Sequence, residues 1–306
     1  MQPLRGIVFK IISVCLFMAM AALIKAASDT VPPGQSVFFR SFFALPIIFV
    51  WLAMRGELRH GWKTDNPMGH FWRGLIGTSA MGLGFAGLGL LPLPEVTAIG
   101  YAAPLLVVIF AAMFLNEDVR AFRLSAVALG MVGVLVVLSP RLSVGAGLNT
   151  SETLGAMVVL MGAVMAALAQ VLVRKLVATE TTVAIVLWFS ITSSVLSLLT
   201  IPWGWAMPGW DLAALLIMAG LLGGLGQIFL TSSYRFADAS LVAPFDYTSM
   251  ILALLIGYFI FDEVPTGTML IGAGIVIFAG VLIIWRERKL GLQRAQQRKA
   301  TGNTGT

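Results

Sequence analysis

Residues 91–117 read LPLPEVTAIGYAAPLLVVIFAAMFLNE, which is a proline-rich opening, a long apolar run and an acidic end. A transmembrane helix needs about 20 consecutive, mostly apolar residues. Transmembrane β-strands are about 10 residues long and alternate between apolar and polar positions. The portion LLVVIFAAMFL (105–115) does not alternate. The stretch therefore predicts a membrane-spanning helix.

The rest of the chain repeats this pattern. Of its 306 residues, 58% are hydrophobic and 11% are charged, against about 45–50% and about 25% in soluble domains. Such a chain cannot cover a water-facing surface, so we predict an all-α integral membrane protein. We expect ten transmembrane helices, over residues 6–27, 34–54, 71–91, 95–115, 121–139, 153–174, 182–203, 210–232, 239–261 and 266–285.

A second stretch, ASLVAPFDYTSMILALLIGYFIFDE (239–263), matches the first at a constant spacing of 146. Tyr101 aligns with Tyr247, and Glu117 aligns with Glu263. Weaker matches align residues 24–42 with residues 174–192. We infer two five-helix repeats over residues 1–142 and 152–290. A repeat unit with an odd number of helices enters the membrane inverted in its second copy.

The basic residues give the orientation. With the N-terminus in the cytoplasm, 17 of the 20 Lys and Arg residues, Arg73 among them, fall in cytoplasmic segments, as the positive-inside rule requires. Arg120 and Arg123 follow Glu117, whereas no base follows Glu263. We expect both termini in the cytoplasm of a bacterium, at its inner membrane, with a basic tail over 291–306 and disorder over 286–306. The bases serve orientation, so nucleic-acid binding gains no support.

Motifs for cofactor, metal or catalytic chemistry are not convincing here. GLGFAG (82–87) matches G-x-G-x-x-G, but it lies in an apolar span and not between a strand and a helix. Its glycines are typical of close helix packing or of a cavity wall. His60 and His70 fall in a basic loop, where we expect them to be solvated. We predict no cofactor, no bound metal and no enzymatic activity.

Charged residues within spans are costly and are functional candidates. Asp246 follows Pro244 in the ninth span, and Lys10 lies at a similar depth in the first. We predict that Asp246 contacts substrate or a proton, with Lys10 as its partner in coupling; a structural salt bridge is the alternative. Arg40, in FFRSFF, either binds substrate or extends to the interface. The acidic corners themselves we interpret as helix ends.

Uncharged polar and aromatic residues complete the predicted substrate site. Amide and hydroxyl groups donate and accept hydrogen bonds, and aromatic faces suit a planar solute. Each of these residues has an interhelical hydrogen bond or packing as its alternative role. The candidates are Gln170, Gln227, Tyr101, Tyr234, Tyr247 and Trp188.

Three segments resemble the EamA-type branch of the drug/metabolite transporter superfamily: FFRSFFALP (38–46), 91–117 and 239–263. The resemblance covers almost the whole chain. It implies a central cavity between the two halves and alternating access without nucleotide hydrolysis. GIVFKI, FFRSFFALP and LPLPEVTAIGYAAPL are also similar to riboflavin-uptake members, so riboflavin uptake is the first expectation. Carriers of S-adenosylmethionine or amino acids are the alternatives, and a membrane enzyme or receptor fits less well. The expected partners are a small solute and lipid.

Overall fold

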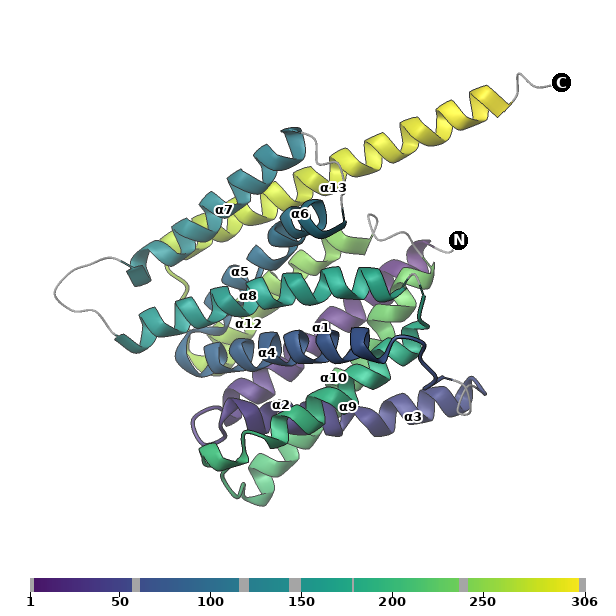
Figure 1. The fold of residues 1–306 in the computed structure, drawn as a ribbon. Helices are drawn as coiled ribbons and strands as arrows, with labels where there is room; N and C mark the ends of the chain where they lie inside the picture. Colours follow the sequence, from purple (N-terminus) through teal and green to yellow (C-terminus); the bar gives the residue numbers. More distant parts are fainter. Residues whose placement is uncertain are drawn as a thin grey trace.

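The computed structural model describes residues 3–56, 61–115, 121–142, 150–177, 179–236 and 242–302, and the regular elements in these ranges are all helices (Figure 1). They are α1 (Pro3–Ala27), α2 (Pro33–Phe42), α3 (Ala44–Met54), α4 (Pro67–Leu90), α5 (Leu93–Gly100), α6 (Ala102–Leu115), α7 (Ala121–Leu142), α8 (Thr150–Val177), α9 (Thr182–Leu198), η1 (Ile201–Trp203), α10 (Trp210–Phe236), η2 (Ala243–Tyr247), α12 (Thr248–Phe261) and α13 (Gly267–Gly302).

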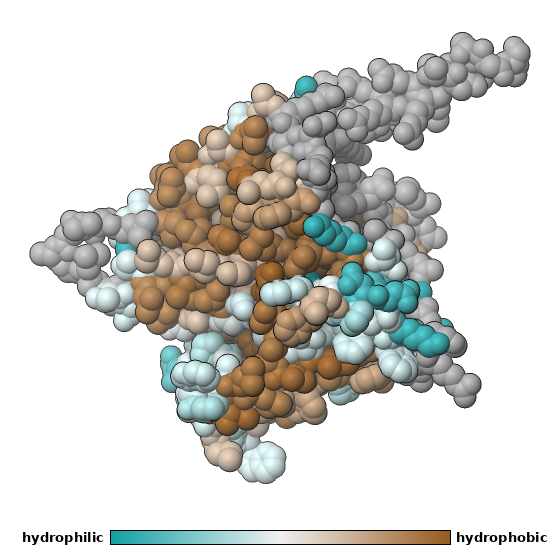
Figure 2. All heavy atoms as spheres, in the orientation of Figure 1, coloured by the Kyte–Doolittle hydropathy of each residue, from teal (hydrophilic) through white to brown (hydrophobic). Residues whose placement is uncertain are grey.

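Seven helical segments in the described ranges are long and apolar enough to cross a membrane. Two shorter apolar helices, Val183–Leu198 and Phe245–Phe261, accompany them. Large apolar side chains point outward from the bundle; Phe259, for example, is 75% exposed. Figure 2 shows this apolar surface over much of the body, as expected of a multi-pass protein surrounded by lipid tails. The seven segments are Leu4–Ala27, Pro33–Met54, Leu93–Phe114, Leu124–Arg141, Thr150–Val177, Trp210–Ser233 and Gly267–Arg286.

Polar contacts gather at two opposite ends of the bundle. At one end, which we name the Glu263 end, Lys25 pairs with Glu263 and Gln35 bonds to Ala206. At the other, the Glu180 end, Thr64 bonds to Glu180. The chain termini lie on the same side of the bundle as the Glu180 end (Figure 1).

Small residues bring the main helices into close contact. The most extensive interfaces join α1 to α10, α4 to α8, and α7 to α13. A Cβ at Gly133 of α7 would lie 2.9 Å from the Gly272 carbonyl oxygen of α13, and one at Gly272 would lie 2.7 Å from the Gly133 oxygen. Gly87 of α4 packs directly on Val159 of α8. Because lipid tails are as apolar as the helices, such backbone approach is what holds membrane helices together.

Three details differ from the predicted spans. The second run is divided between α2 and α3 at Phe43, and the fourth between α5 and α6 at Tyr101. The ninth begins with the 3₁₀ turn η2, so Asp246 lies in that turn and not within a continuous α-helix. The predicted disorder after residue 286 is wrong as far as Gly302, because α13 continues to that residue.

Candidate functional site

Lys10 and Asp246 form an ion pair inside the bundle. The Lys10 Nζ lies 2.7 Å from Asp246 Oδ1, and α1 and η2 are in contact. The Lys10 side chain is 2% exposed, whereas that of Asp246 is 48% exposed. Because a buried ammonium requires a counter-charge, Asp246 stabilises Lys10 in place. The free part of the carboxylate still faces accessible space, where it could meet a solute or a proton.

Two tyrosines lie beside this pair, one from each half of the chain. Tyr101 sits at the break between α5 and α6, and its ring meets that of Tyr247 edge-on at 5.1 Å. The Tyr101 hydroxyl and the Ser249 Oγ are 2.6 Å apart, and Ser249 also donates to the Asp246 carbonyl. The Tyr247 hydroxyl packs on Gly280 of α13. The structure thus brings Lys10, Asp246, Tyr247 and Tyr101 together; we name these four the charged-pair cluster.

Four other predicted site residues lie on other helices, α8, α9 and α10. Gln170 is exposed on α8, and Gln227 is partly exposed on α10. The Trp188 Nε1 donates to the Trp62 carbonyl over 2.9 Å, which places it at the Glu180 end. The side chain of Tyr234 lies outside the described residues. We predicted these residues as site residues because they are polar or aromatic side chains within spans. That property does not indicate on which face of a helix a residue lies.

Arg40 belongs to a second cluster, with Arg73 and Phe189. Arg40 on α2 is 7% exposed, and its guanidinium carbon lies 5.8 Å from the centre of the Phe189 ring. The Arg73 guanidinium lies over the same ring at 3.9 Å. We expected Arg73 in a cytoplasmic segment, at the start of the third span. Arg73 lies on α4, and its Nε and Nη1 atoms are buried.

Glu263 is more than a helix end, which corrects our interpretation of this corner. Its Oε1 lies 2.9 Å from Lys25 Nζ, and its Oε2 accepts a 2.8 Å bond from the Leu93 backbone N–H. Lys25 also donates to the Leu88 and Leu91 carbonyls. One carboxylate therefore ties the end of α12 to α1 and to the start of α5. The other corner, at Glu117, lies outside the described residues.

His70 is buried and not solvated, which corrects the second loop prediction. It lies on α4 at 2% exposure, with Nε2 3.5 Å from Glu180 Oε2. Glu180 Oε1 accepts bonds from the Thr64 hydroxyl and from the Asp65 and Asn66 backbone N–H groups. Burial raises the pKa of Glu180, but the hydrogen bonds from Thr64 and the two N–H groups, with the His70 ring nearby, outweigh it and hold the pKa below its ordinary value.

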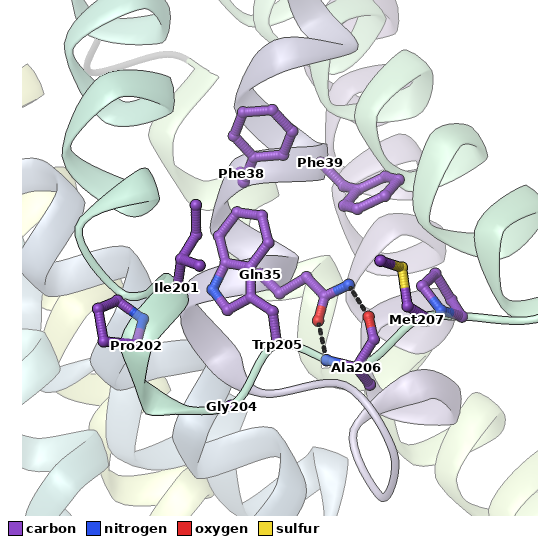
Figure 3. Close-up of a pocket in the computed structure, with 10 residues that line it drawn as sticks. Gln35, Phe38, Phe39, Ile201, Pro202, Gly204, Trp205, Ala206 and Met207 are labelled. Carbon is purple, nitrogen blue, oxygen red and sulfur yellow. Dashed lines mark hydrogen bonds between the residues drawn. The ribbon is translucent and has the colours of Figure 1, made fainter.

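A pocket of about 490 Å³ opens at the Glu263 end, between α2 and the loop that follows η1 (Figure 3). Gln35 crosses it with two bonds to the Ala206 backbone, of 2.9 and 3.0 Å. The remaining lining is largely aromatic and aliphatic, with Phe38 and Trp205 5.3 Å apart. The pocket carries no charged side chain and lies away from the charged-pair cluster. We interpret the pocket as the place where the loop after η1 packs against α2.

Comparison with known proteins identifies the class. The helices, apolar surface and internal ion pair define a multi-pass membrane protein. The model of the EamA-like transporter family matches residues 4–139 and again residues 153–286, and the chain belongs to this family. A solved structure covers 93% of the chain, and 98% of its own, at a TM-score of 0.65 and 19% identity, which shows a shared fold.

Relatives with transport functions align over most of the chain. The S-adenosylmethionine uptake transporter of Rickettsia felis is 27% identical over 288 residues, 94% of each chain. The pseudopaline exporter of Pseudomonas aeruginosa is 28% identical over 291 residues, 93% of this chain and 97% of the exporter. The riboflavin transporter of Rhizobium johnstonii is 27% identical over 261 residues, 84% of this chain and 83% of the transporter.

Proposed function

We propose that this chain is a secondary transporter that moves a small polar metabolite across the bacterial inner membrane by alternating access. The observation that carries the proposal is the Lys10–Asp246 ion pair inside a bundle of a transporter family. Charged side chains within a membrane bundle cost free energy, so they are candidates for a functional role. A cationic solute group, or a proton, would bind at the exposed part of Asp246 and compete with Lys10 for the carboxylate.

The proposal includes ten crossings in two inverted halves, over 1–142 and 152–290. The two family matches, 4–139 and 153–286, support this division. The helix interfaces support it too. If one half is superposed on the other, α1 corresponds to α8 and α4 corresponds to α10. The α1–α10 interface then corresponds to the α8–α4 interface, and both are extensive. In the same superposition α7 and α13 correspond to each other, and these two helices share an interface.

Reporter fusions test the inverted arrangement independently of transport. A reporter fused after residue 118 should be cytoplasmic and one fused after residue 265 external, with the basic tail of 291–306 in the cytoplasm. The same side for both fusions would contradict the inverted halves.

In the proposed cycle, α1 and η2 move relative to each other when Asp246 changes partner. While Asp246 holds Lys10, the two elements are joined. A solute cation or a proton at Asp246 weakens that attraction and frees α1 to shift against η2. Tyr101 and Tyr247, one from each proposed half, would contact the solute beside the pair.

Two solutes merit testing first. Riboflavin is the expectation from local sequence resemblance, and a named riboflavin transporter is among the relatives. S-adenosylmethionine is the solute of a relative that aligns over more of the chain. Its sulfonium and ammonium groups would suit Asp246.

Uptake into membrane vesicles tests this function. Vesicles containing the full chain should take up labelled S-adenosylmethionine or riboflavin with saturation and without ATP, and Asp246→Asn should reduce the flux at least tenfold. Lys10→Met should reduce it as well. Intact transport in Lys10→Met would remove the proposed coupling role of the pair. An aromatic amino acid serves as the third labelled solute.

A further inference from the structure

Arg40 and Arg73 are buried charged residues that do not belong to the charged-pair cluster. These two cations come from different helices, α2 and α4, and both lie against the ring of Phe189 on α9. Arg40 is 93% buried, as its 7% exposure shows. Both guanidinium groups lie against one ring, and like charges placed near one another repel. The arrangement therefore needs an explanation.

Neither arginine has an anionic partner within the described ranges. Buried Nε atoms of both residues, and Nη1 of Arg73, have no hydrogen-bond acceptor there. The ring of Phe189 offers each a cation–π contact, which stabilises a cation without satisfying its N–H donors. Leaving such a donor unpaired costs free energy, and more so for a charged group. A negatively charged hydrogen-bond acceptor would satisfy these donors.

Two glycines provide the space in which the guanidinium groups lie. A Cβ at Gly77 of α4 would overlap Arg73 Nη1 and lie 2.9 Å from Phe189 Cε2. Gly77 follows Arg73 by one helical turn, so the arginine can lie along its own helix toward Phe189. A Cβ at Gly223 of α10 would lie 3.3 Å from Arg40 Nε. Each arginine thus occupies a place that a larger residue would close.

We propose that Arg40 and Arg73 form an oxyanion site that binds a carboxylate or phosphate group of the transported solute. This inference rests on the proposed transport function and narrows its substrate class. A guanidinium presents its donors in a planar fork that matches both oxyanions. A bound anion would satisfy the free N–H groups and relieve the repulsion between the two cations.

This site distinguishes the two candidate solutes. S-adenosylmethionine carries a carboxylate, whereas riboflavin carries no ionised group at neutral pH. With its carboxylate at the arginines, S-adenosylmethionine would satisfy their free N–H groups. A solute without an oxyanion would leave the arginines unsatisfied, which costs affinity.

The first test measures binding without transport, so it is independent of whether any solute is moved. The full chain is kept in an uncharged detergent at constant ionic strength, and chloride is replaced stepwise by acetate or by phosphate. Ligands that bind the folded state raise its unfolding temperature with concentration. We expect this rise in the wild type and in Arg55→Met, whose arginine is exposed, but not in Arg40→Met or Arg73→Met. An equal rise in all four proteins would overturn the site.

The second test compares solutes that differ by one oxyanion. The pairs are S-adenosylmethionine with its decarboxylated analogue, and riboflavin 5′-phosphate with riboflavin. The wild type should bind the anionic member of at least one pair at least tenfold more tightly. Arg40→Met and Arg73→Met should reduce that preference to about twofold, and Arg73→Lys should keep part of it because the charge remains. A preference that survives both methionine variants contradicts the proposal.

A third arm separates a solute from a lipid headgroup, since both can supply phosphate. Phosphatidylglycerol is added to the lipid-free protein. Stabilisation by this lipid alone, lost in both methionine variants, would identify a lipid site and overturn the solute assignment. Asp246→Asn should retain the acetate and phosphate response, since that response depends on the arginines.

Discussion

Lys10 Nζ and Asp246 Oδ1 are 2.7 Å apart, but the two side chains are unequally exposed, at 2% and 48%. The two partners therefore contribute differently to stability. Removing the carboxylate leaves a buried ammonium without this counter-charge, and breaking a buried pair in this way costs about 3–5 kcal/mol. Removing the ammonium leaves a carboxylate that is half hydrated.

We therefore predict that Asp246→Asn lowers the unfolding temperature in detergent more than Lys10→Met does. The double variant should lie close to Lys10→Met, because the buried charge is absent from both. Circular dichroism during heating measures all three. The reverse order for the single variants would show that Asp246 does not stabilise Lys10.

The Glu263 carboxylate should hold its end of the bundle closed. Glu263→Gln removes the charge that pairs with Lys25, and it weakens the bond to the Leu93 N–H. A loss of about 1.4 kcal/mol from the closed state would raise the open population about tenfold. Thr97 lies on α5, one turn after Leu93, and its hydroxyl donates to the Leu93 carbonyl. In a Cys15→Ser background, we expect maleimide to label Thr97→Cys correspondingly faster when Glu263→Gln is present.

Asp262→Asn is the matched control for that experiment. Asp262 is adjacent in sequence and adopts a left-handed backbone with φ of 54°, which asparagine also tolerates. Its substitution should leave the labelling rate unchanged. Equal acceleration by both variants would mean that the corner loosens generally and that Glu263 has no specific role.

Gly77 should be required for the oxyanion response, since it leaves space for Arg73. Gly77→Ala introduces a methyl group where Arg73 Nη1 lies, so the guanidinium must move away from Phe189. Gly84→Ala on the same helix meets open space and is the control. We expect the stabilisation by acetate or phosphate to fall at least fivefold in apparent affinity in Gly77→Ala only. An unchanged response would contradict the position of Arg73 in the site.

Glu180 should make stability depend on pH at the Glu180 end. Its pKa in the folded protein is below the ordinary value, about 4.3 for glutamate, because the hydrogen bonds from Thr64, Asp65 and Asn66, with His70 nearby, outweigh burial. Its contribution is therefore complete above the unfolded pKa and is lost as the pH falls through the folded pKa. We expect Glu180→Gln to be less stable than the wild type at pH 6, with the difference shrinking below about pH 4.

Asp65→Asn is the control for the pH series, because the Asp65 side chain is exposed in the loop before α4 and Asp65 contacts Glu180 through its backbone N–H. Its unfolding temperature should follow that of the wild type across the range. A difference between wild type and Glu180→Gln that stayed constant down to pH 3 would show that Glu180 ionisation does not contribute.

The sequence predicted helices well because lipid leaves the backbone few alternatives. It also singled out Asp246 and Lys10, since depth along a span can be counted from its start. Depth does not reveal the face of a helix, and so Gln170, which is exposed, and Trp188, which bonds to Trp62, were grouped with residues that lie elsewhere.

For Arg73 and His70, the sequence did not reveal burial. Both precede the apolar part of α4, and their chemistry is typical of a loop. Their burial depends on partners distant in sequence, Phe189 for Arg73 and Glu180 for His70. The glycine at 77, one turn after Arg73, was a usable signal, because a small residue there permits an arginine to lie along the helix.

Solute counterflow in proteoliposomes tests the central claim, alternating access, most directly. Vesicles containing the purified chain are loaded with excess unlabelled S-adenosylmethionine or riboflavin and diluted into the labelled solute, without ATP or an ion gradient. An alternating-access carrier should accumulate the label transiently above its equilibrium level, and Asp246→Asn should abolish this overshoot. Saturable entry without any overshoot would indicate a channel, and no saturable flux of either solute or of an aromatic amino acid, in either direction, would contradict the transporter assignment.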